Sequence, residues 1–83
     1  MMSKRPLVIS PMQLQQNDVL TVYSPDGNFR DNDYMITNEE GRVIRKGSIS
    51  ANLSEFKLRI VGLKAGVYRL VMGQYQEKFI VSA

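Results

Sequence analysis

Apolar and polar side chains alternate along three stretches in the second half of the chain. In Phe56–Ile60 the first, third and fifth residues are apolar, whereas Lys57 and Arg59 lie between them. Successive side chains of a β-strand point to opposite faces of the sheet, so this pattern predicts a strand with one buried and one solvated face. The stretches Val67–Met72 and Tyr75–Val81 also alternate but carry apolar residues on both faces, which favours strands in the middle of a sheet.

Glycine and proline residues divide the whole chain into segments of strand length. Between them the sequence predicts about seven strands, each rich in β-branched or aromatic residues: Leu7–Ile9, Val19–Tyr23, Tyr34–Thr37, Arg42–Arg45, Phe56–Val61, Val67–Met72 and Tyr75–Val81. Several short strands separated by turn residues are typical of an all-β sandwich or barrel. We therefore expect a small antiparallel β-sandwich.

One segment, Leu53–Leu63, also fits a helix. Its apolar residues recur at helical spacing, and a capping side chain is available before them. Strict alternation over five residues and the neighbouring β-branched pair Ile60 and Val61 favour the strand.

Four short segments predict turns. Ser24–Gly27 has proline and glycine where a type I turn places them. Asn38–Gly41 and Leu63–Gly66 each end in a glycine that can adopt positive φ, as hairpin loops of this length require. Met72–Gln74 is short enough to join the last two strands as a closing hairpin.

The composition excludes most catalytic chemistry. The chain has 83 residues, with no Cys, His or Trp. It therefore lacks the usual near-neutral acid or base, the thiolate nucleophile and the ligands of a structural zinc. We expect one domain spanning residues 1–83, with residues 1–6 as a flexible tail, no cofactor and no enzymatic activity.

Ser54 and Lys57 have the spacing of a Ser-x-x-Lys catalytic dyad. That dyad needs a helix, because residues three apart share a face on a helix and point to opposite faces on a strand. Since a strand is predicted here, we interpret the match as accidental.

The segment Asp26–Asp33 is rich in oxygen-bearing side chains, as calcium-binding loops are. Helix-loop-helix calcium sites require glycine at the sixth position and glutamate at the twelfth, and neither register of this segment supplies them. A solvated loop is the simpler interpretation. An irregular calcium site remains an alternative, with ligands from Asp26, Asn28, Asp31 and Asp33.

Charge is distributed unevenly along the chain. Up to Gly41, six acidic residues outnumber three basic ones, whereas eight basic residues accompany two acidic ones from Arg42 onward. Basic residues of the second half can form a patch across adjacent strands, as in oligonucleotide-binding barrels. Because we expect the aromatic residues to fill the core, a small nucleic-acid-binding barrel is only the alternative to a protein-binding module.

The amino-terminal segment predicts neither an export signal nor a membrane span. Lys4 and Arg5 are followed by Leu7–Ile9 alone before Ser10 and Pro11 end the apolar run. A secretory signal needs about 7–15 apolar residues and a membrane span about 20. We expect no membrane insertion. A complete gene product of this sequence would be cytoplasmic, and the end of a longer exported precursor would be secreted or at the cell surface.

Three segments of the chain resemble a bacterial protein family: Asn38–Ile44, Leu63–Val71 and Lys78–Val81. Their order and approximate spacing are similar to those of the C-terminal sorting domain of proteins exported by the type IX secretion system. That family shows a turn ending in Gly-Arg, a Gly-x-Tyr strand and a final strand with a basic residue. The resemblance extends from about Val19 to the last residue and implies an immunoglobulin-like β-sandwich.

The resemblance also implies roles for particular residues. Gly41 and Gly66 would supply turns, and Tyr68 would bury its ring while its hydroxyl reaches a backbone group. The implied function is a non-enzymatic sorting or interaction module. The uneven charge, and not the resemblance, predicts the surface that its protein partner would bind: a basic strand face drawn from Arg42, Arg45, Lys46, Lys57, Arg59, Arg69 and Lys78. A free-standing sandwich with another role remains an alternative, and an exposed edge strand would allow either a monomer or a weak dimer.

Overall fold

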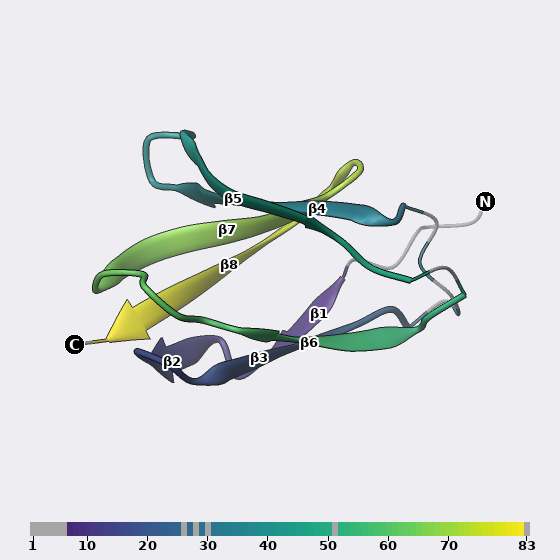
Figure 1. Ribbon diagram of the computed structural model, residues 1–83, viewed down its shortest axis with the longest axis horizontal. Coiled ribbons are helices and arrows are strands. Elements are labelled where there is room, and N and C mark those ends of the chain that lie inside the picture. The colour runs from purple at the N-terminus through teal and green to yellow at the C-terminus, as the bar shows by residue number, and fades with distance from the viewer. Residues whose placement is uncertain (1–6, 26, 28, 30, 51, 83) are drawn as a thin grey trace.

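The chain folds into β-strands joined by turns and loops (Figure 1). The structure is a computed structural model and describes residues 7–25, 27, 29, 31–50 and 52–82. Within these ranges there is no helix, and eight strands are present: β1 (Val8–Ser10), β2 (Gln13–Gln15), β3 (Val19–Tyr23), β4 (Asp33–Asn38), β5 (Val43–Ser48), β6 (Glu55–Arg59), β7 (Gly66–Met72) and β8 (Tyr75–Ser82). Residues 1–6, for which we predicted a tail, lie outside the described ranges.

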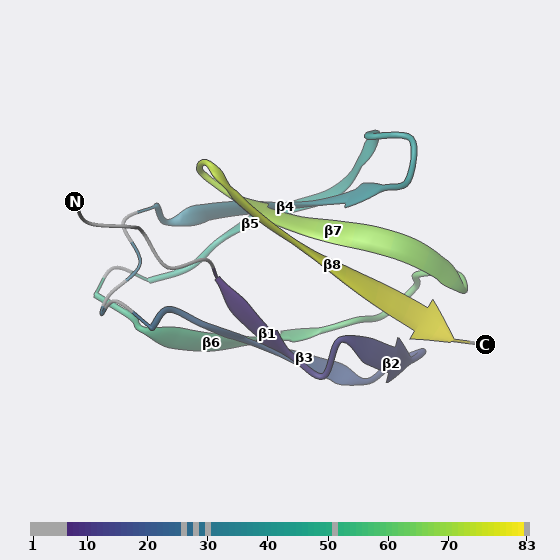
Figure 2. The same ribbon diagram turned by 180° about the vertical axis from the view of Figure 1, so that it is seen from behind.

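The strands form two sheets that lie in two layers, as the opposite views show (Figures 1 and 2). One sheet has three strands in the order β1-β3-β6, and the other has five in the order β2-β8-β7-β4-β5. All neighbouring strands are antiparallel except β2 and β8. This is a small immunoglobulin-like β-sandwich, and it confirms the predicted fold class.

The core lies between the sheets and follows from the predicted alternation. Inward-facing residues of the two sheets form one cluster that includes Leu20 and Val22 of β3 and Ile36, Leu70 and Phe79 of the five-stranded sheet; all five are fully buried. The strands β7 and β8 are central, each with a neighbour on both sides, as their apolar residues on both faces predicted.

The predicted strand in Leu53–Leu63 is confirmed as β6, and the helical alternative is wrong. β6 pairs antiparallel with β3, with Phe56 opposite Val22 and Leu58 opposite Leu20. Phe56 and Leu58 are half-buried and pack against the core, whereas the residues between them are exposed. Burial of every second residue of this segment is the pattern of a strand with one buried face, not of a helix.

The strand β2 was not predicted. Its only apolar residue, Leu14, is buried and lies opposite Val81 of the parallel strand β8, while Gln13 and Gln15 are exposed. The preceding Ser10–Pro11 peptide bond is cis and lies where the chain passes from the small sheet to the large one. A single apolar residue gives no period, so the pairing partner and not the local pattern defines this strand.

Two hairpins follow the predicted turns. Met72 lies opposite Tyr75, so β7 and β8 are joined by a two-residue loop that begins with Gly73 at φ +60°. Between β4 and β5, the side-chain Oδ1 of Asn38 accepts hydrogen bonds from two backbone N–H groups of the loop, each 3.0 Å long. Gly41 adopts φ +83° in that loop, a conformation that favours glycine. The predicted turn at Ser24–Gly27 includes Asp26, which lies outside the described residues.

Candidate functional site

Tyr68 anchors the start of β7. Its hydroxyl donates a hydrogen bond of 2.6 Å to the backbone carbonyl of Lys64, and its ring stacks on Phe79 at a centroid distance of 5.7 Å. In immunoglobulin domains a tyrosine near the start of the equivalent strand makes the same kind of bond to the backbone upstream. A Cβ atom built on Gly66, two residues before, would meet the tyrosine ring at an ordinary contact distance of 3.8 Å. This corner fixes the position of β7, the strand that carries Arg69.

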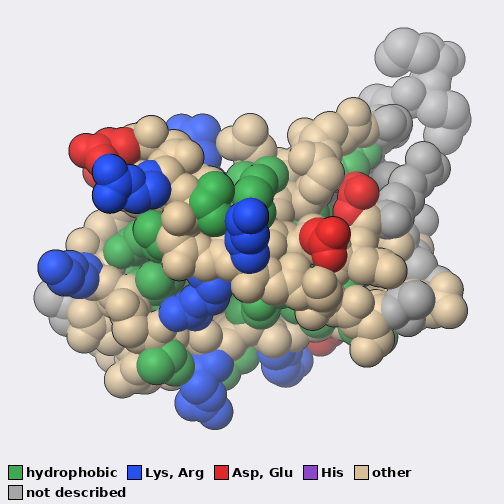
Figure 3. All heavy atoms as spheres, turned by 45° about the horizontal axis from the view of Figure 1, so that its top comes forward, with side chains coloured by type: hydrophobic (Ala, Val, Ile, Leu, Met, Phe, Trp, Pro, Cys, Tyr) green, Lys and Arg blue, Asp and Glu red, His purple; other side chains and the backbone are tan. Residues whose placement is uncertain are grey.

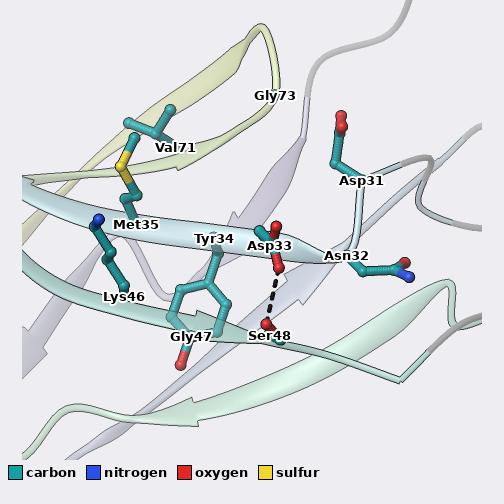
Figure 4. Close-up of a pocket in the computed structure, with 10 residues that line it drawn as sticks. All are labelled: Asp31, Asn32, Asp33, Tyr34, Met35, Lys46, Gly47, Ser48, Val71 and Gly73. Carbon is teal, nitrogen blue, oxygen red and sulfur yellow. Dashed lines mark hydrogen bonds between the residues drawn. The ribbon is translucent and has the colours of Figure 1, made fainter.

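The strand register defines the outward surface of the five-stranded sheet, which we call the outer face. Met35 lies opposite both Val71 and Lys46, and Thr37 lies opposite Arg69. Figure 4 shows Met35, Lys46 and Val71 projecting from the same side of the sheet. From these pairings and from β8, the outer face consists of Asp33, Met35, the buried Thr37, Val43, Lys46, Ser48, Val67, Arg69, Val71, Gln76, Lys78 and Ile80.

Two positive charges lie directly opposite each other at the centre of the outer face. Arg69 of β7 is paired with Lys78 of β8, the neighbouring central strand. Arg69 reaches the side chain of Gln76 at 3.5 Å, and no described carboxylate forms an ion pair with either cation. Like charges opposite each other on a sheet destabilise it by roughly 0.2–1 kcal/mol. The outer face therefore presents positive charge that the described acidic residues do not neutralise.

Lys57 and Arg59 lie elsewhere, on the outward surface of the three-stranded sheet. Both are exposed residues of β6, and Lys57 forms an ion pair of 3.2 Å with Glu55 on the same strand. Because the two sheets face each other across the core, these cations point away from Arg69. The structure thus divides the basic residues proposed for one strand face between opposite sides of the sandwich.

The two remaining arginines lie outside the outer face. Arg45 is half-buried at the edge of β5, and its guanidinium group donates hydrogen bonds to the backbone carbonyls of Arg59, at 3.4 Å, and of Val61. It thereby links the edges of the two sheets. Arg42 is exposed and lies at the end of the β4–β5 turn, separated by Gly41 from the acidic residues Glu39 and Glu40. Of the seven predicted cations, only Lys46, Arg69 and Lys78 share the outer face.

Charged side chains of both signs lie on the face seen in Figure 3. Figure 3 looks obliquely onto the five-stranded sheet and shows Lys and Arg side chains spread over it, with hydrophobic side chains exposed between them. Asp and Glu side chains gather in two places towards opposite ends of this view. Val43, Ile44 and Ile80 are each between 38% and 40% exposed. The five-stranded sheet therefore combines positive charge with accessible apolar area.

An open depression of about 580 Å³ lies at one end of the outer face, where β4, β5 and the β7–β8 turn meet (Figure 4). Asp31 and Asp33 line one side of it and Lys46 lines another. The hydroxyl of Ser48 donates a hydrogen bond of 2.8 Å to Asp33, and the carboxylate of Asp31 lies against Gly73. Both aspartates thus contact neighbouring residues of their own chain.

The irregular calcium site considered from the sequence depends on Asp26 and Asn28, which lie outside the described residues. In the part of the chain that the structure does describe, no group of three or more acidic side chains is arranged to hold a metal ion. Ser54 precedes β6 and Lys57 lies within it, so the structure does not give this pair the helical arrangement of a Ser-x-x-Lys dyad. Nor does a helix with the length and apolar character of a membrane span occur in the described ranges.

Aromatic side chains serve mainly to fill the interior. Phe56 packs against Phe29 and Tyr34 at centroid distances of 5.2 and 5.8 Å. Of the tyrosines, Tyr23 is exposed at 44% and lies on the small sheet, opposite Glu55. Single-stranded nucleic acids bind to surfaces that combine positive charge with stacking aromatic rings. The outer face has the charge but, among its described residues, no aromatic ring.

No protein-family model matches the sequence, and no match to a curated protein was found.

Proposed function

We propose that this chain is a non-enzymatic sorting or interaction module that binds a protein partner through the outer face of its five-stranded sheet. The observation that carries the proposal is the pairing of Arg69 with Lys78 at the centre of that face. The pairing lowers the stability of the isolated domain, and an acidic group on a partner would remove the cost.

The character of the surrounding surface supports a protein as the partner. Met35, Val67 and Val71 are half-buried on the outer face, and Ile80 is 38% exposed, so apolar area lies beside the two cations. Protein interfaces combine an apolar centre with charged groups that determine orientation and specificity. A single-stranded nucleic acid would instead use aromatic stacking platforms, and the described residues of this face include none.

The sorting role is supported by the resemblance to the type IX C-terminal domains. The Gly-x-Tyr segment that carries this resemblance is the corner that positions Arg69 on the outer face. We infer that a component of the bacterial export machinery is the partner and that the domain acts as its recognition element.

A reporter fusion tests this function. The full chain is attached behind a fluorescent protein with a secretory signal in a bacterium that has a type IX system, and cell fractionation measures where the reporter accumulates. We expect most of the reporter at the cell surface or in the medium. Retention of the folded fusion in the periplasm would contradict the sorting role.

Charge reversal on the two sheets supplies matched controls. The double variant Arg69→Glu with Lys78→Glu changes the outer face, whereas Lys57→Glu with Arg59→Glu changes the opposite sheet by the same amount of charge. We expect the first pair to reduce export by roughly tenfold, the effect of losing about 1.4 kcal/mol of binding free energy, and the second to leave it within about twofold. Thermal unfolding of each variant verifies that the domain remains folded.

A further inference from the structure

The strand β5 has an open edge, because it pairs with β4 on one side only. The N–H of Ile49 donates a hydrogen bond of 2.7 Å to the carbonyl of Asn32, so the backbone N–H and C=O groups of Ile49 point towards β4. Hydrogen-bonding groups alternate in direction along an antiparallel pair. The backbone N–H and C=O groups of Lys46 and Ser48 therefore point away from β4, and no described strand pairs with them.

Positive charge flanks this edge. Arg42, Arg45 and Lys46 lie on or next to β5, and the sequence has no acidic residue from Arg42 to Ser54. Lys46 is exposed and lies in one row with Met35 and Val71 of the outer face (Figure 4). An added strand beside β5 would thus extend the outer face and meet positive charge at Arg42 and Lys46, with Asp33 of β4 lying next to Ser48 at the other end.

The charge also determines which strand fits. A second copy pairing antiparallel with β5 and centred on Lys46 would place Lys46 opposite its own counterpart, and like charges across a strand pair are destabilising. A lysine on an edge strand is a common protection against such self-association. The open edge of β6 differs, because Lys57 is neutralised there by Glu55. The edge of β5 therefore favours an acidic strand from another protein.

We propose that an extended acidic segment of a partner protein adds to β5 as an antiparallel strand. It forms backbone hydrogen bonds with Lys46 and Ser48 and places a carboxylate opposite the Lys46 side chain. Binding of this kind takes its affinity from backbone hydrogen bonds and its specificity from alternate side chains. The inference rests on the proposed function, in that the partner is a protein and its bound segment continues the contact made by the outer face.

A peptide titration tests the pairing. The probe is a short capped peptide in which valine and glutamate alternate, added to the isotope-labelled full chain while backbone amide resonances are recorded by NMR. We expect shifts concentrated at Val43–Ser48 and contacts between peptide and β5 backbone protons. Shifts confined to other strands, or no shifts at millimolar peptide, would overturn the proposal.

Two modified peptides separate strand pairing from simple charge attraction. With glutamate opposite Lys46, the glutamate N–H groups face β5 and the valine N–H groups face solvent. Methylating the glutamate nitrogens should weaken binding by roughly tenfold or more, whereas methylating the valine nitrogens should change it little. Equal binding by both methylated peptides would contradict backbone pairing.

Charge recognition is tested by Lys46→Glu in the protein and by a matched peptide with lysine in place of glutamate. We expect the variant to bind the glutamate peptide about fivefold more weakly and the lysine peptide more strongly than the unmodified protein does. Concentration-dependent shifts at β5 without any peptide would indicate a second copy as the occupant and would overturn the proposal.

The titration and the reporter fusion test different claims, so a negative result in one does not decide the other. If the peptide does not bind at β5 while the outer-face charge reversal still reduces export about tenfold, the edge pairing is wrong and the proposed function stands. If the peptide pairs with β5 but the reporter stays in the periplasm, the sorting role is wrong.

Discussion

A close contact between Gly47 and Tyr34 gives a sharp test of how the edge strand is packed. The two residues lie directly opposite each other on β5 and β4, and the Tyr34 ring projects to the side of the sheet opposite Lys46 (Figure 4). A Cβ atom built on Gly47 would lie 2.5 Å from Cζ and 2.7 Å from Cε2 of that ring. Contacts this short do not occur, so Gly47→Ala must displace the ring by about 1 Å to reach ordinary packing distance.

The expected cost follows from two opposing effects. Gly47 is not among the glycines with positive φ, so alanine can adopt its backbone conformation and gains about 0.5–1 kcal/mol from the smaller entropy of the unfolded chain. Forcing an extra carbon into a packed site costs about 1–3 kcal/mol. The ring is half-buried and lies against Phe56, so it cannot move freely. We expect a net loss of about 1 kcal/mol, which lowers the Tm of a domain of this size by about 4–8 °C.

A double-mutant cycle isolates the contact. Urea unfolding is followed by circular dichroism for Gly47→Ala alone, for Tyr34→Ala alone and for both together. In the Tyr34→Ala background the steric conflict is absent, so Gly47→Ala should stabilise the domain by about 0.5–1 kcal/mol. The reasoning is refuted if Gly47→Ala has the same effect in both backgrounds.

Three further substitutions test other parts of the structure. Tyr68→Phe keeps the buried ring but removes its hydrogen bond to the backbone, and we expect it to lower the free energy of unfolding by about 1 kcal/mol in urea; no change would show that the bond contributes nothing. Asn38→Ala removes the acceptor of two loop N–H groups, so amide exchange should accelerate in the β4–β5 turn and remain unchanged in β7, and uniform acceleration would contradict a local role. Lys78→Gln removes one of the two like charges, so it should raise the free energy of unfolding by about 0.2–1 kcal/mol at low salt and by less at high salt. A lower free energy of unfolding would show that Arg69 and Lys78 do not repel each other.

The sequence predicted the parts of the fold in which local pattern and tertiary environment agree. Phe56, Leu58 and Ile60 alternate with charged residues, and burial of a single face preserves that period in β6. The strand β2 was missed because Leu14 has no apolar neighbour and is held by β8 from the other end of the chain. Pairing across such a separation leaves no local signal.

The candidate surface was harder to predict, because it depends on which sheet each strand joins. Lys57 and Arg69 have similar surroundings in the sequence, yet β6 and β7 belong to different sheets, so the two side chains point to opposite sides. The pairing of Arg69 with Lys78 required the register of β7 and β8, which the short loop at Gly73 sets. The closing hairpin predicted at Met72–Gln74 contained that information, since a two-residue loop fixes which residues lie opposite each other.

Site-specific photocrosslinking tests most directly whether the outer face contacts the partner. A photoreactive amino acid is placed at Ile80, on the outer face, or at Tyr23, on the opposite sheet, in the exported reporter fusion; these positions are 38% and 44% exposed, so they are closely matched. After illumination of living cells, we expect a crosslinked protein from Ile80 and none from Tyr23. Crosslinking from Tyr23 alone would contradict the assignment of the outer face as the binding surface.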